Sequence, residues 1–306
     1  MLIAMRTLAF VFLTVCLLPG CGDSSDDSSA SDEKSGPPPV SAVEEESDPA
    51  KTTAATLLRK LRDANPEYNN NAQAVDGPDG YVAQVMLKDS GITDITPLRG
   101  TRLTTLDLGG VPVTDIAPLE GMPLQTLWLD EAQVEGLSPL KGMPLQQLHM
   151  NNCPVSEISA LKGMPLTQLN LYGTKVTRID IVEGMPLNIL WLTNTAITDL
   201  SPLEGNGLES LDVQGAPIKD LSVVATLPRL LRLNIAETPV TDLTPLKDLT
   251  LQRLVFTPKN IRKGIDVVRA MSSIQQIGPN FEFTQQRIPP AEFWKLYDKG
   301  EFHLAR

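Results

Sequence analysis

Few residues in this sequence have the types and spacing that catalysis or metal binding needs. Histidine occurs only as His149 and His303, and cysteine only as Cys16, Cys21 and Cys153. Neither histidine has a partnered cysteine or a set of carboxylates at metal-ligand spacing, and no Ser–His–Asp order stands out. We therefore expect a protein that is not an enzyme and that carries no metal and no cofactor.

A column of aspartates at regular spacing could suggest a ladder of calcium sites. Its members are Asp94, Asp115, Asp199, Asp220 and Asp242. Each of them opens the same kind of turn, where a short polar side chain accepts hydrogen bonds from nearby backbone N–H groups. The column is also broken by Gly136 and Arg178. We interpret these aspartates as turn residues, and Cys153 as a buried structural thiol at a position that threonines occupy elsewhere in the chain.

The charge of the chain is concentrated near its N-terminus. The 306 residues carry a formal net charge of −11, but residues 22–50 alone hold nine acidic side chains and one lysine. Residues 51–306 hold 28 acidic and 24 basic side chains, a difference of −4. An acidic chain without a basic stripe is unlike a nucleic-acid-binding protein, and we expect no nucleic-acid partner.

The first 21 residues, MLIAMRTLAFVFLTVCLLPGC, are predicted to form a signal sequence. Arg6 precedes an apolar stretch that is too short to span a membrane comfortably. The ending Leu-Pro-Gly-Cys resembles a bacterial lipoprotein signal, which implies that Cys21 is lipidated and becomes the mature N-terminus. The alternative is an ordinary secretory signal in which Cys21 has no role. Both readings predict export, and the first predicts a lipid anchor in the bacterial cell envelope.

Residues 22–51 are predicted to be a disordered linker. They are rich in Ser, Pro and acidic residues and contain too few apolar side chains to form a core. A flexible coil of this length typically reaches about 30 Å. The linker would hold the folded part near a membrane while leaving it free to turn.

Residues 93–260 contain eight repeats. Units begin at positions 94, 115, 136, 157, 178, 199, 220 and 242, in steps of 21 residues and finally 22. One leucine column consists of Leu106, Leu127, Leu148, Leu169, Leu190, Leu211, Leu233 and Leu254. Each L-x-x-L-x-L run predicts a short strand whose leucines point inward, and recurring prolines predict tight turns on the return path. Because 21 residues leave no room for a full α-helix, the pattern predicts an α/β solenoid with a parallel concave sheet and a 3₁₀ or extended convex side.

The repeat D-I-x-P-L-x-G-M-P-L-x-x-L-x-L resembles the short bacterial leucine-rich repeat, internalin-like in its turn but one residue shorter. The resemblance covers about residues 52–306. The flanking segments resemble a bacterial subfamily whose arrays are often appended to serine/threonine kinases. The chain has no glycine-rich phosphate loop followed by a catalytic loop, so the resemblance implies no kinase activity.

The exposed ends of a solenoid need caps. Residues 52–92 are predicted to form an N-terminal cap, with a helix over 53–64 and a partial repeat. Residues 261–306 are predicted to form a C-terminal cap, with a helix around 265–271 and the aromatic residues Phe293, Trp294 and Tyr297 folded onto the last coil.

The outward-facing strand positions are the candidate binding surface, because the fold does not dictate their residue types. This candidate surface consists of Trp128, Asp130, His149, Asn151, Asn170, Tyr172, Trp191, Asp212 and Arg232. Aromatic rings surrounded by polar side chains are typical of recognition hot spots. The alternative is that the rings only pack on one another and cover the sheet.

Three functions remain open from the sequence. The leading hypothesis is a non-catalytic, membrane-tethered, monomeric module that binds a protein or peptide on its concave face. The second is binding of a cell-wall glycan through stacking on Trp128, Tyr172 and Trp191. The third is a passive envelope scaffold without a specific ligand.

Overall fold

The structure is a computed structural model that describes residues 48–286 and 288–302. These residues belong to one compact unit, Glu46–Arg306. The predicted signal sequence with Cys21 and nearly all of the predicted linker lie outside the described residues. Within the described ranges, no helix combines the length and the apolar character that crossing a bilayer requires.

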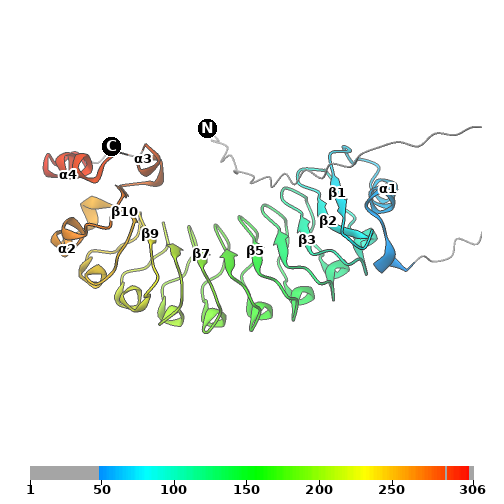
Figure 1. The fold of residues 1–306 in the computed structure, drawn as a ribbon, viewed down its shortest axis with the longest axis horizontal. Helices are drawn as coiled ribbons and strands as arrows, with labels where there is room; N and C mark the ends of the chain where they lie inside the picture. The colour runs from blue at the N-terminus through cyan, green and yellow to red at the C-terminus, as the bar shows by residue number, and fades with distance from the viewer. Residues whose placement is uncertain (1–47, 287, 303–306) are drawn as a thin grey trace, which may run out of the picture. The chain divides into compact units, whose positions relative to one another are not determined.

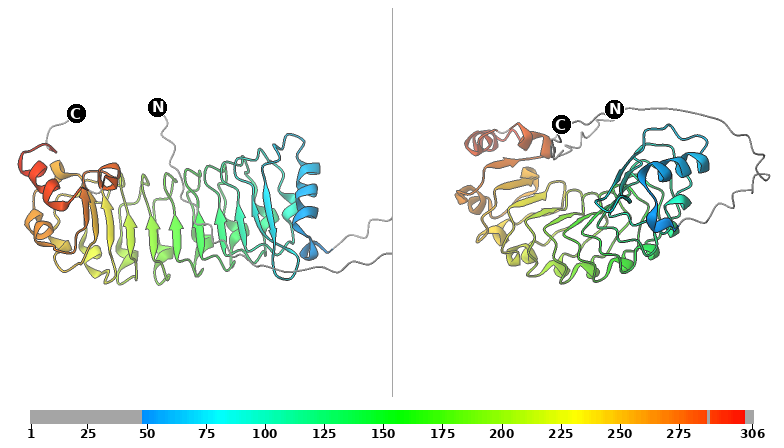
Figure 2. Two further views of the ribbon diagram at one scale, coloured as in Figure 1. Left: turned by 45° about the horizontal axis from the view of Figure 1, so that its top comes forward. Right: turned by 45° about the vertical axis from the view of Figure 1, so that its right-hand side comes forward.

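Eleven strands form a single sheet in the order of the chain (Figures 1 and 2). Strands β2 to β11 run parallel, and β1 pairs antiparallel with β2. The strands are β1 Gln73–Asp76, β2 Val82–Met86, β3 Thr105–Asp107, β4 Thr126–Trp128, β5 Gln147–His149, β6 Gln168–Asn170, β7 Ile189–Trp191, β8 Ser210–Asp212, β9 Arg232–Ile235, β10 Arg253–Phe256 and β11 Gln276–Gly278. The eight predicted repeats supply β3 to β10, and the sheet continues by one parallel strand on each side.

The pairing register places equivalent residues of successive coils next to each other. Leu106 pairs with Leu127, and Leu127 pairs with Leu148. These leucines are fully buried, as are their equivalents through the array. Neighbouring strands lie about 4.8 Å apart, so each buried side chain packs on its counterparts in the coils before and after it. The predicted parallel sheet and the inward direction of the leucines are both confirmed.

Short 3₁₀ turns line the convex side opposite the sheet (Figure 1). They are η2 Thr96–Leu98, η3 Ala117–Leu119, η4 Ser138–Leu140, η5 Ser159–Leu161, η6 Asp180–Val182, η7 Ser201–Leu203, η8 Ser222–Thr226 and η9 Thr244–Leu246; η1 Pro49–Lys51 and η10 Pro258–Asn260 lie outside this row. The aspartate column caps these turns, as the sequence predicts. Asp94 Oδ1, for example, accepts a hydrogen bond from the Thr96 backbone N–H at 2.8 Å, and Asp199 Oδ1 accepts one from Ser201 at 2.8 Å.

The N-terminal cap consists of helix α1, Ala54–Ala64, and the β1–β2 hairpin. Leu57 and Leu61 of α1 are fully buried. The buried amide of Asn65 joins the end of this helix to the first turn, since its Nδ2 donates to the Asp94 carbonyl at 2.8 Å and its Oδ1 accepts from the Asp94 N–H at 2.8 Å. The helix follows the sequence prediction. Strand β1 does not, because most of its residues are exposed and leave no apolar pattern.

The C-terminal cap consists of helices α2 Ile265–Ala270, α3 Phe281–Gln285 and α4 Pro290–Asp298, together with β11. Phe293 of α4 is fully buried, and its ring centroid lies 5.9 Å from that of Phe256 in β10. Trp294 packs against Phe293 at 5.0 Å and holds the guanidinium of Arg269 over its ring at 4.7 Å. Trp294 is therefore part of the cap, as the sequence predicts.

We predict that Gly264→Ala destabilises the C-terminal cap far more than Gly142→Ala destabilises the array. Both glycines have left-handed backbones, with φ of +82° and +77°. A Cβ at position 264 would lie 2.4 Å from Thr244 N and 2.6 Å from Leu243 C, whereas one at position 142 would meet nothing within 4 Å. We expect a loss of about 1–2 kcal/mol for G142A, from backbone strain alone, and about 2–5 kcal/mol for G264A. Urea unfolding followed by circular dichroism measures both, and equal losses would contradict the packing of α2 against η9.

Candidate functional site

The outward strand positions form parallel rows across the concave face. The register pairs Trp128 with His149, Asn170 with Trp191, and Trp191 with Asp212. Asp130, Asn151 and Tyr172 follow the ends of their strands, while Arg232 begins β9. The structure thus places all nine residues of the candidate surface on the same side of the sheet. Whether they bind a ligand stays a prediction.

Trp128, His149 and Trp191 form a continuous aromatic strip along the middle of this face. The His149 ring centroid lies 6.0 Å from that of Trp128 and 5.8 Å from that of Trp191. Trp191 lies two strands away from His149, so its ring extends past the intervening Asn170. All three strip side chains are half-buried. The rings therefore support each other and still present part of their surface outward.

The strip holds His149 in its neutral form. Burial lowers the pKa of His149 from 6.5 to about 4, and the nearby charge of Asp107 opposes this shift only in part. An imidazole between two indoles has lost most of its hydration, which penalises the charged form. At neutral pH the strip is uncharged and can contact apolar groups along its whole length.

The N-terminal part of the concave face is acidic. Burial is the main cause that raises the pKa of both Asp107 and Asp130. Asp130 Oδ1 accepts a hydrogen bond from the Asn151 backbone N–H at 2.9 Å. The Oδ1 atom of Asn151 is itself buried and accepts no hydrogen bond from the described residues. The hydrogen bond from Asn151 to Asp130 joins the residues that follow β4 and β5.

Two further polar residues of the candidate surface already have structural partners. Asn170 Oδ1 accepts a hydrogen bond from the Tyr172 backbone N–H at 3.0 Å. The Tyr172 hydroxyl accepts one from Asn194 Nδ2 at 3.4 Å. This hydrogen bond joins the hydroxyl of Tyr172 to the next coil.

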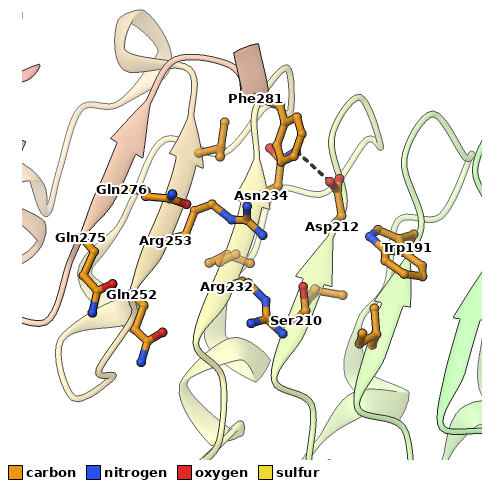
Figure 3. A pocket seen from close by; sticks show the side chains of 14 residues that line it. Trp191, Ser210, Asp212, Arg232, Asn234, Gln252, Arg253, Gln275, Gln276 and Phe281 are labelled. Atoms are coloured by element: carbon orange, nitrogen blue, oxygen red, sulfur yellow. Dashed lines mark hydrogen bonds between the residues drawn. The ribbon is translucent and has the colours of Figure 1, made fainter. Parts of the chain in front are cut away.

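A pocket of about 550 Å³ lies at the C-terminal end of the concave face (Figure 3). It is lined by Ile189, Trp191, Ser210, Leu211, Asp212, Arg232, Leu233, Asn234, Gln252, Arg253, Val255, Gln275, Gln276 and Phe281. Trp191 lies at one side of the pocket, Gln275 and Gln276 lie at the other, and Phe281 of α3 lies over Arg253. We refer to it below as the arginine pocket.

The candidate surface derived from the sequence includes three of the 14 residues that line this pocket, Trp191, Asp212 and Arg232. Arg253 occupies the same repeat position as Arg232, so the sequence did carry a signal for it. Phe281 and Gln276 follow the last recognisable repeat, where no periodic pattern places them.

The described residues offer little for chemistry. Burial raises the pKa of the Cys153 thiol to about 12, and its Sγ donates to the Leu129 carbonyl at 2.9 Å. Within residues 48–286 and 288–302, no cluster of three or more His, Cys, Asp or Glu side chains is arranged to hold a metal ion. What the concave face does offer is an apolar strip with an acidic and a basic end.

We predict that His149 titrates near pH 4. Because the folded pKa lies below the unfolded value of 6.5, the unfolded chain binds a proton between about pH 6.5 and 4 that the folded chain excludes. Stability from this group is present at pH 7 and falls with pH across that window, by an amount on the order of 3 kcal/mol. The imidazole ¹H NMR signals follow the titration, and H149Q identifies which signal belongs to His149. A midpoint near 6.5 would show that the imidazole is solvated and the strip open.

The fold is shared with solved structures of bacterial proteins. The chain is similar to internalin C2 from Listeria monocytogenes str. 4b F2365, with a TM-score of 0.56 and 22% identity over 67% of this chain and 93% of that chain. It is also similar to the internalin inlF from the same strain, with a TM-score of 0.50 and 18% identity over 78% of this chain and 92% of that chain. No protein-family model matches the sequence, and no curated protein matches it. The chain therefore has the leucine-rich repeat fold of the internalin type. The spacing of its leucines predicts the repeat solenoid, and the resemblance of its repeat implies the internalin type.

Proposed function

We propose that this protein is a non-catalytic recognition module that binds a protein or peptide on its concave face. The observation that carries the proposal is the half-buried aromatic strip at the centre of that face. Binding energy at protein interfaces is concentrated in aromatic and arginine anchors surrounded by polar residues. The strip and the arginines beside it supply both kinds of anchor.

The packing of the rings on each other does not remove this capacity. Side chains that cover a sheet without binding anything need not be tryptophan, since the inward leucines already form the core. A strip whose rings are fixed by mutual contact loses little conformational entropy when a partner docks. The curved parallel sheet gives an extended partner several successive coils to contact.

We predict that Trp128→Ala combined with Trp191→Ala weakens partner capture at least 30-fold, because truncating a single aromatic anchor typically costs about 2 kcal/mol or more. The measurement is photocrosslinking in intact cells through p-benzoylphenylalanine at position 172, beside the strip, followed by mass spectrometry. With both tryptophans present, the protein should form one discrete crosslinked product with its partner. The double tryptophan variant should not form this product.

Two controls belong to this experiment. The same photoreactive residue at position 183, exposed on the convex side, should not capture the partner. The convex pair Lys162→Ala and Glu183→Ala should leave the product from position 172 unchanged. Equal products from the two faces, or a product that survives the tryptophan changes in a folded protein, would contradict concave recognition. If no protein is crosslinked and cell-wall glycans cause a saturable change of tryptophan fluorescence, the ligand is a carbohydrate and not a peptide.

We also propose that a lipid on Cys21 holds the module at a membrane of the cell envelope. Support comes from the sequence alone, through the signal ending and the acidic linker that follows it. We predict that Cys21→Ser shifts the protein from the membrane fraction to the soluble fraction, while the matched change Cys16→Ser does not. Fractionation with immunoblotting measures both, and membrane retention of the C21S protein would contradict the anchor.

A further inference from the structure

The arginine pocket contains two positive charges that form no ion pair with the described residues. Arg232 and Arg253 lie side by side, because their Cα atoms are paired on the adjacent parallel strands β9 and β10. Both side chains line the pocket (Figure 3). In the part of the chain that the structure describes, neither guanidinium forms an ion pair or a hydrogen bond. Some arginines elsewhere form ion pairs, as Arg229 does with Glu209 and Arg269 with Asp298.

The one acidic residue among the pocket-lining side chains is already engaged by neutral groups. Asp212 Oδ1 accepts hydrogen bonds from the Thr193 hydroxyl at 2.7 Å and from the Gln214 backbone N–H at 3.0 Å. Its Oδ2 accepts one from Asn234 Nδ2 at 2.8 Å, the contact drawn in Figure 3. The carboxylate is therefore held by groups on neighbouring coils, and it accepts no hydrogen bond from either arginine.

The surroundings of Arg253 strengthen its interaction with an anion. The Phe281 ring covers its guanidinium at 5.4 Å from the ring centroid. Burial is the main cause that lowers the pKa of Arg253, the charge of Arg232 adds to it, and the charge of Asp212 opposes it. A guanidinium nevertheless stays protonated in proteins. Two like charges beside each other in a partly dehydrated pocket repel, and an anion placed between them relieves that repulsion.

The chemistry of the pocket matches a carboxylate. Each guanidinium presents a planar fork of N–H donors that fits two carboxylate oxygens. The side chains of Gln252, Gln275 and Gln276 add neutral amide donors around the charged pair. The volume of about 550 Å³ admits one or two amino-acid side chains.

The occupant must also fit what adjoins the pocket. Trp191 belongs to both the aromatic strip and the pocket wall, so the two are continuous. Strands β7 and β10 are three spacings apart, about 14 Å, which an extended peptide covers in roughly four residues. A chain lying across the face can thus place an apolar residue on the strip and an acidic residue in the pocket.

We infer that the arginine pocket binds a side-chain carboxylate of the polypeptide partner, an Asp or Glu about four residues from the apolar residue on the aromatic strip. This inference rests on the proposed function and specifies the partner chemistry. Arg232 and Arg253 clamp the carboxylate, and Phe281 shields the contact from water.

The test uses phage display to select random dodecapeptides that bind the full-length protein. The C-terminus of each peptide is fused to the phage coat protein, so the carboxylates of the peptide are those of its side chains. We expect the selected peptides to share an Asp or Glu at a fixed spacing from an aromatic or aliphatic residue. A selected peptide, synthesised with both ends blocked, should bind Arg232→Gln/Arg253→Gln at least tenfold more weakly than the unaltered protein. Higher salt should weaken its binding to the unaltered protein much more than its binding to this variant.

A matched control removes the same charge elsewhere. Arg229→Gln/Arg262→Gln changes two exposed arginines that do not line the pocket, and this variant should bind the peptide normally. Arg232→Lys/Arg253→Lys keeps the charge without the planar forks and should bind with intermediate affinity. Circular dichroism establishes that each variant is folded.

The outcomes separate this inference from the proposed function. If selected peptides lose affinity for W128A/W191A but bind R232Q/R253Q normally, concave recognition stands and the carboxylate pocket is wrong. If the selected peptides share no Asp or Glu, or inorganic phosphate displaces them where acetate does not, the side-chain carboxylate is the wrong ligand. If the unaltered protein selects no peptide at all, both proposals fail.

Discussion

The whole structure depends on the stacking of successive coils in register. Parallel pairing aligns Leu106, Leu127 and Leu148 and continues through the array, so each buried leucine packs on its equivalents in the neighbouring coils. A single coil could not bury these side chains, and stability is therefore a property of neighbours. The same register aligns the outward residues into rows. The pairing register therefore determines both the leucine core and the concave surface. A shift in the register of one strand would disturb both.

The two ends of the stack are closed by different means, and one of them contributes to the candidate site. At the N-terminal end, α1 and the β1–β2 hairpin cover the first coil, and the buried Asn65 amide ties them to it. At the C-terminal end, an aromatic cluster around Phe293 buries the last coil. The chain leading into that cluster passes over the concave face and brings Phe281 above Arg253. Capping and pocket formation are thus coupled at this end.

The sequence predicts the periodic part of the molecule and misses the parts where the period ends. Leucines spaced by 21 residues determine the strands, their direction and the outward rows, so the position of Trp128, His149 and Trp191 on one face followed from phase alone. Strand β11 has only Ile277 as a strongly apolar residue, too little for a periodic signal. The contact between His149 and Trp191 was also beyond prediction, because it depends on a side-chain rotamer that reaches across a strand. For the same reasons the sequence predicted only the part of the arginine pocket that the repeats supply.

Local charge matters more than net charge on this surface. Residues 51–306 carry only four more acidic than basic side chains, which provides little long-range attraction or repulsion. From Asp107 on β3 to Arg253 on β10 is seven strand spacings, about 34 Å, several times the screening length of about 8 Å at physiological salt. The acidic and basic ends therefore act independently on whatever lies above each of them. Between them the strip is uncharged at neutral pH and has no electrostatic preference for a partner of either sign. Affinity would come from the strip, and the direction in which a partner lies would come from the charged ends.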